Sequence, residues 1–184
     1  MVSRVGATLS TMKPLADFSI EALYAALDAQ RVARGIAWQQ VTREVNALFE
    51  HVPSRPISSS TLTGMRSKQA IDGDGVLQML RWLDRTPESF VPGYERSMPE
   101  ATPLPSVGRD QILRFDTKAL YLALNTQRLE REQTWVTVAR EIGGLNAASL
   151  SRYENGGRTG FPQIMRITRW LWRPAASFTR AFNR

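Results

Sequence analysis

The sequence of 184 residues contains no cysteine, and its single histidine is His51. Without cysteine, the chain can form neither a disulfide bond nor a thiolate metal site. With one histidine, a zinc site or a Ser-His-Asp catalytic site is not expected either. Because the sequence also shows no nucleophile–base pair and no phosphate-binding loop, we expect no enzymatic activity, no metal and no cofactor.

Long apolar runs are missing as well. The first fifteen residues have no continuous apolar stretch fit for a signal peptide, and no segment approaches the roughly 20 apolar residues of a membrane span. The missing cysteines favour a reducing compartment. We therefore expect a cytoplasmic protein without a membrane partner.

Basic residues, by contrast, are in excess: 24 Lys and Arg against 17 Asp and Glu give a net charge of +7. Such a balance favours an anionic partner, most often nucleic acid, although an incidental surplus is the alternative. The excess is uneven. Residues 14–93 hold 8 basic and 9 acidic residues, whereas residues 109–184 hold 13 and 6. Because phosphate affinity depends on charge, we expect the second segment to dominate binding to nucleic acid.

These two segments are copies of one another. Phe18–Arg31 matches Phe115–Arg128 at an offset of 97 residues, and the offset falls to 88 further along, where Leu62 matches Leu150. The first copy therefore carries nine extra residues. Four prolines between residues 92 and 108 disfavour regular helix there. We predict an N-terminal domain at 14–93, a proline-rich linker at 94–108 and a C-terminal domain at 109–184.

Within each copy the patterns predict short helices and no convincing strand. Apolar residues recur at helical spacing in both copies: Leu23, Leu27 and Val32, then Leu120, Leu124 and Leu129. In the second copy we expect a helix from Trp135 to Ile142, capped by Thr134, and another from Ala147 to Glu154, capped by Asn146. The predicted fold class is all-α.

The segment from Trp135 to Gly156, WVTVAREIGGLNAASLSRYENG, resembles the phage-repressor (Cro/Xre) helix-turn-helix family. Val138 and Ala139 resemble the core pair of the family's second helix, and the string from Ser149 onward resembles its third helix and following turn. One extra residue in the turn at 143–145 departs from the pattern. Through the duplication, the resemblance implies two tandem lambda-repressor-like bundles of four or five helices each.

The resemblance also implies a DNA-binding site. In such proteins the third helix lies in the major groove with its first residues against the base edges. Arg152 is the strongest candidate for reading a base, because a guanidinium can donate two hydrogen bonds to one guanine. The other DNA-binding residues that we predict in the second copy are Thr134, Asn146, Ala147, Ala148, Ser149, Asn155 and Arg158. For Asn155, helix capping alone is the alternative.

By the same comparison, we expect the first copy to recognise DNA bases more weakly than the second. Its counterpart of Arg152 is Gly64, which offers no side chain to a base, and Ala37 replaces the capping Thr134. Its reading segment carries only hydroxyls, which suit water or phosphate contacts, at Ser58, Ser59, Ser60 and Thr61. The extra loop at 46–57 is either a protein-binding surface or a simple insertion, and we favour an insertion.

The predicted function is that of a sequence-specific regulator of transcription that binds double-stranded DNA and is associated with the nucleoid. The alternative is a protein-interaction module on the same scaffold, like an anti-activator or an antitoxin. The first copy either reads DNA weakly or serves as the contact for a homodimer or another protein. For the complex we favour two chains on a palindrome over one chain on two unlike half-sites.

Overall fold

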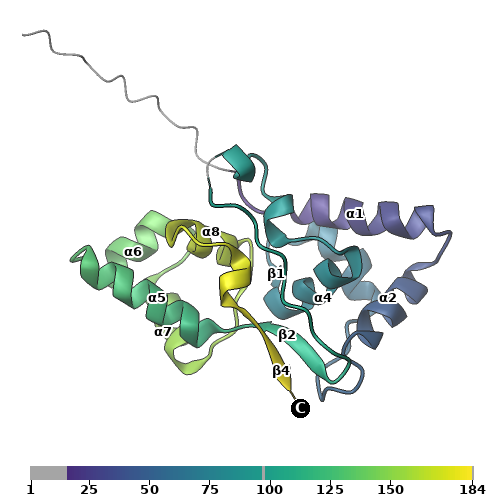
Figure 1. Ribbon diagram of the computed structural model, residues 1–184. Coiled ribbons are helices and arrows are strands. Elements are labelled where there is room, and N and C mark those ends of the chain that lie inside the picture. The colour runs from purple at the N-terminus through teal and green to yellow at the C-terminus, as the bar shows by residue number, and fades with distance from the viewer. Residues whose placement is uncertain (1–15, 97, 184) are drawn as a thin grey trace, which may run out of the picture.

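The computed structural model describes residues 16–96 and 98–183, in which each copy forms four α-helices. Figure 1 shows the two copies on opposite sides of the molecule, with the first helix of each running outward in opposite directions. The first copy contains α1 (Ile20–Ala33), α2 (Trp38–Ala47), α3 (Ser59–Thr63) and α4 (Gly73–Leu83). The second contains α5 (Thr117–Glu130), α6 (Trp135–Ile142), α7 (Ala147–Ser151) and α8 (Gln163–Trp170).

Short 3₁₀ turns complete the helical part. They are η1 (Met65–Ser67), η2 (Pro87–Phe90), η3 (Tyr94–Arg96), η4 (Arg152–Asn155) and η5 (Ala175–Phe178). The turns η1 and η4 follow the third helix of each copy, and η2 and η5 follow the fourth. The four helices and the turns after the third and fourth helices therefore follow in the same order in both copies, whereas η3 of the first copy has no 3₁₀ counterpart in the described part of the second.

The fold also contains two small antiparallel sheets, so the prediction of an all-α fold is wrong. Strand β2 (Gln111–Phe115) pairs with β4 (Thr179–Asn183), and β1 (Ile71–Asp72) pairs with β3 (Gly160–Phe161). The chain is of mixed α/β class. Strands of two residues leave no periodicity in a sequence, and β2 has two adjacent buried residues where an alternating pattern would signal a strand.

Equivalent residues make equivalent contacts in the two copies. The Gln30 side chain donates a hydrogen bond to the Trp82 carbonyl at 3.1 Å, and Gln127 donates one to the Trp170 carbonyl at 2.9 Å. Each bond ties the end of the first helix of a copy to the end of its fourth. The duplication seen in the sequence is thus a duplication of tertiary structure.

One predicted apolar stripe is only partly buried. Leu23 and Leu27 of α1 are fully buried, but Val32 is 60% exposed, and its counterpart Leu129 is 58% exposed. Five residues along an α-helix correspond to a rotation of about 140° from the starting face. Val32 therefore points away from the core that Leu27 enters.

The two copies share one hydrophobic core instead of lying apart on a flexible tether. Phe18 of the first copy packs on Phe161 of the second, with ring centroids 4.3 Å apart. The segment between the copies also adds to this core through the buried Tyr94 and through Leu104 and Val107, which pack against it. The boundaries predicted for two separate domains stay predictions.

Within the described ranges, no helix is long and apolar enough to cross a membrane.

Candidate nucleic-acid interface

The helices α6 and α7 of the second copy, with the turn between them, form the predicted reading unit. Helix α6 begins after Thr134, whose hydroxyl accepts a hydrogen bond from the Thr137 amide at 3.2 Å. Val138 and Ala139 are buried, as their resemblance to a helix-turn-helix core pair implies. Trp135 stacks on Tyr121 with ring centroids 5.3 Å apart, so its ring serves packing within the copy.

The turn between α6 and α7 has a backbone that glycine adopts most easily. Gly143 and Gly144 have φ angles of +75° and +68°, a region that residues with a side chain rarely enter. Arg166 of α8 supports the turn by donating a hydrogen bond to the Gly143 carbonyl at 3.3 Å.

Helix α7 is short and firmly capped. The Asn146 side chain accepts hydrogen bonds from the Ser149 amide at 2.8 Å and from the Ser149 hydroxyl at 3.0 Å. Asn146 itself is exposed, and Ala147 and Ser149 are half-buried. The Ser149 hydroxyl therefore already has a partner, and it is less available to a base than the sequence suggested.

On α7 and the 3₁₀ turn η4 that follows it, the exposed residues are Ala148, Ser151, Arg152, Glu154 and Asn155. Leu150 and Tyr153 are buried behind it, and the Tyr153 hydroxyl lies 3.1 Å from the Thr159 hydroxyl in the interior. Burial raises the pKa of Tyr153 above its ordinary value, so the side chain stays neutral. These two anchors decide which residues of α7 and η4 face solvent.

Sequence reasoning missed Ser151, which is exposed although its hydroxyl donates to the Ala147 carbonyl at 3.1 Å. Its position three residues after Ala148 on a helix could have revealed it.

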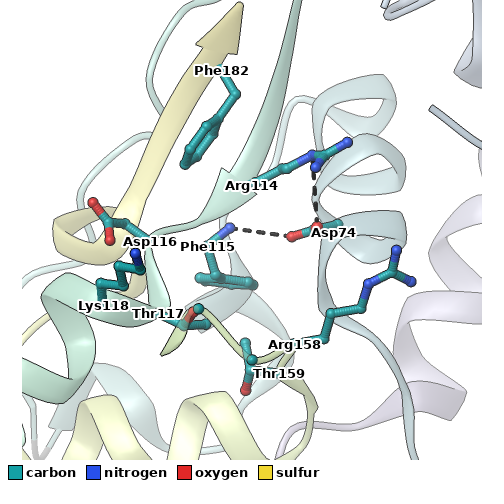
Figure 2. Close-up of a pocket in the computed structure, with 11 residues that line it drawn as sticks. Asp74, Arg114, Phe115, Asp116, Thr117, Lys118, Arg158, Thr159 and Phe182 are labelled. Atoms are coloured by element: carbon teal, nitrogen blue, oxygen red, sulfur yellow. Dashed lines mark hydrogen bonds and ion pairs between the residues drawn. The ribbon is translucent and has the colours of Figure 1, made fainter. Parts of the chain in front are cut away.

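Asn155 and Arg158 are exposed in the segment that follows α7, as a role beside phosphates would require. Arg158 also lines a pocket of about 250 Å³ between the copies, together with Arg114 and Lys118 (Figure 2). Two carboxylates, Asp74 and Asp116, balance these cations. Burial raises the pKa of Asp74, which accepts a hydrogen bond from the Phe115 amide at 3.2 Å.

In the first copy the corresponding unit is α2 and α3. The Ser58 hydroxyl caps α3 by accepting a hydrogen bond from the Thr61 amide at 3.1 Å, and Ala37 offers no side-chain cap to α2. Ser60 and Thr61 are exposed. Ser59 is half-buried, with its hydroxyl 2.9 Å from that of Thr42 on α2.

The extra loop of the first copy packs against the second copy. Phe49 and Val52 form a small apolar cluster with Ile112 of β2. The loop is closed at its base by Asn46, whose side chain both donates to and accepts from the Ile57 backbone at 2.9 Å. The loop therefore covers the side chain of Ile112 on β2, a role that the sequence alone did not suggest.

Among the described residues, no three His, Cys, Asp or Glu side chains lie together as a metal site would need. The described residues instead offer hydroxyls on α3 and α7, and exposed guanidinium groups at Arg66 and Arg152 in the 3₁₀ turns that follow these helices. Such groups can bind phosphates and base edges.

Comparison with known proteins identifies no relative: no model of a protein family, no curated protein and no solved structure matches this chain.

Proposed function

We propose that this chain binds double-stranded DNA in a sequence-specific manner and regulates transcription, with α7 in the major groove. The observation that carries the proposal is the exposed face of the capped α7 and η4, on which Arg152 stands beside Ala148 and Ser151. A guanidinium reads guanine through two hydrogen bonds, and the flanking small side chains allow the helix to approach the bases closely. Such a protein would be found in the cytoplasm, at the nucleoid.

The charge distribution supports the proposal. The second copy, residues 109–184, has an excess of seven basic residues, whereas residues 14–93 have one acidic residue in excess. Arg140 on α6, and Arg152 and Arg158 after the start of α7, are all exposed. Cations on and beside a reading helix supply the salt-dependent affinity for phosphate on which base recognition is built.

The test is titration of the full chain against its best duplex, recovered by genome-wide mapping of bound DNA, and against a scrambled duplex. Arg152→Ala should weaken binding to the best duplex by about 1–3 kcal/mol and leave the scrambled duplex much less affected. Arg158→Ala should weaken both about equally, because a phosphate contact carries no sequence information.

Arg173→Ala is the matched control, since it removes the same charge from an exposed residue after α8. It should leave the ratio of the two affinities unchanged. If Arg152→Ala also leaves this ratio unchanged, Arg152 does not read a base. If the wild-type chain shows no preference for any duplex, the protein-interaction alternative replaces the proposal.

A further inference from the structure

The two copies meet through equivalent residues. Strand β1 pairs with β3 in antiparallel fashion, with Asp72 opposite Gly160. These two positions are each other's counterparts, since 88 residues separate them and this is the offset of the duplication in that region. When equivalent residues pair in antiparallel fashion, the two units are related by a twofold rotation, as in a symmetric dimer. An approximate twofold axis therefore passes through this pair.

The same approximate twofold axis relates the aromatic contacts between the copies. Phe18 of the first copy packs on Phe161 of the second. The counterpart of Phe18 is Phe115, and the counterpart of Phe161 is Gly73. Phe115 does lie over Gly73, so closely that a Cβ atom there would be 3.0 Å from the Phe115 ring.

The polar contacts are reciprocal too. On α4, the buried Gln78 donates a hydrogen bond to the Leu113 carbonyl at 2.8 Å. Leu113 lies just before α5, the first helix of the second copy. On α8, Arg166, the counterpart of Gln78, donates a hydrogen bond to Asp17 at 2.8 Å, just before the first helix of the first copy. Each fourth helix thus holds the segment that leads into the other copy's first helix.

The same axis relates the two reading helices. Helix α3 is capped by Ser58 and α7 by Asn146, and these caps are counterparts at the offset of 88 residues. A homodimer needs two chains to present two reading helices about a twofold axis. In this protein one chain presents both, and the shared core fixes their separation.

The reading surface of the first copy also carries positive charge, although that copy as a whole does not. Arg66 and Lys68, which follow α3, are exposed, as is Arg43 on α2. Arg43 is the counterpart of Arg140 on α6. A net charge counted over residues 14–93 averages these cations with acidic residues on other faces, so it understates the affinity of this surface for phosphate.

We propose that one chain reads one asymmetric duplex, with α7 on one half-site and α3 on an unlike half-site. This inference rests on the function proposed above and replaces the arrangement of two chains on a palindrome. The exposed Arg152 selects guanine in one half. In the other half, the exposed Ser60 and Thr61 make the contacts, and their hydroxyls exchange the hydrogen bonds that they form with the Ser58 hydroxyl, at 2.8 and 2.9 Å, for bonds to the duplex. The position of Arg152 is taken by Gly64.

The test begins with selection of duplexes from a random 30-base-pair library by the full chain. Native mass spectrometry should find one chain on each selected duplex, and the recovered motif should have two unlike halves. Arg152→Ala should relax the base preference in one half, and the double variant Ser60→Ala/Thr61→Val should relax it only in the other. Thermal melting of both proteins checks that they remain folded.

Spacing provides the second arm of the test. Inserting 5 base pairs between the halves turns one half-site to the opposite face of the duplex, and inserting 10 restores the face but moves the half-site by about one helical turn, ~34 Å. Because the copies are held rigidly, both insertions should reduce affinity to that of a single half-site, a loss of about 100-fold or more.

The inference is overturned if two chains occupy a palindrome, if the α3 variant changes no base preference, or if the 10-base-pair insertion binds like the parent duplex. In all three cases DNA binding itself would stand. If the selection enriches no duplex, the proposed function fails, and the inference fails with it.

Discussion

At the scale of single residues, Glu88 joins the two copies. Only 2% of this residue is exposed, and its carboxylate accepts a hydrogen bond from the Ala175 amide of the second copy at 2.7 Å. The Glu88 charge also acts on the neighbouring buried Tyr94. Burial is the larger cause and the Glu88 charge the smaller one, and together they raise the pKa of Tyr94 to about 12. Glu88 is therefore a structural carboxylate in the interface between the copies.

Glu88→Ala should destabilise the protein by about 1–3 kcal/mol, because the Ala175 amide would be left buried without a hydrogen bond. Denaturant unfolding at pH 7 measures the change. Glu100→Ala removes the same charge from an exposed residue, and it should change the stability by less than about 0.5 kcal/mol. Equal stability of the two variants would mean that the Ala175 contact contributes nothing.

At the scale of secondary-structure elements, Glu44 ties α2 to the end of α1 and to α4. Its carboxylate accepts two hydrogen bonds from Arg34, at 2.6 and 2.9 Å, and one from the Trp82 indole at 2.8 Å. The bonds from Arg34, then those from Trp82 and Gln40, lower the pKa of Glu44 from 4.5 to about 2. The folded state therefore binds the charged form of Glu44 in preference to the protonated form.

Because folding lowers the pKa of Glu44, its charged carboxylate stabilises the folded protein at pH values above the unfolded-state pKa of 4.5. This stability is lost as the pH falls from about 4.5 through the folded-state pKa of about 2. Because the pair is partly exposed to solvent, we expect this contribution to stability to be small. Glu44→Gln should therefore lower the stability slightly at pH 7, and the difference from the wild type should disappear only below about pH 2. Unfolding measured across this range tests it, with Glu100→Gln as control. A deficit that does not change with pH would show that the charge of Glu44 is irrelevant.

At the scale of the whole molecule, the close approach of the copies depends on a glycine. A Cβ atom on Gly73 would lie 2.8 Å from the Thr159 carbonyl oxygen and 3.0 Å from the Phe115 ring, both in the second copy. Two residues later in the same turn of α4, a Cβ atom on Gly75 would find its nearest neighbour at an ordinary 3.6 Å. The two glycines therefore offer a matched pair of substitutions.

Gly73→Ala should destabilise the protein by about 1–3 kcal/mol, because the backbones of the two copies must separate to admit the methyl group. Gly75→Ala should stabilise it by up to about 1 kcal/mol, because alanine favours a helix over glycine. Thermal unfolding of both variants measures the difference. If the two variants melt alike, the contact between the copies is not as tight as described.

The sequence by itself determined the duplication, the bounds of α6, and the caps of α6 and α7, although α7 ends at Ser151 and passes into η4 where the sequence predicted helix up to Glu154. These features are local: the residues at Thr134 and Asn146 satisfy amides only three positions away, and Gly143 and Gly144 set a turn within their own segment. For the same reason, the sequence located the exposed Arg152. It misjudged Val32, where a spacing of five residues was taken for one helical face.

Only the tertiary structure decided how the copies join. Two contacts connect residues more than 80 positions apart: Asp72 pairs with Gly160, and Glu88 accepts a hydrogen bond from Ala175. No local sequence pattern predicts such contacts. The same holds for the strands β2 and β4, and for the loop that covers Ile112. These contacts bury residues that are far apart in the sequence against one another, so the symmetry of the molecule appears in three dimensions alone.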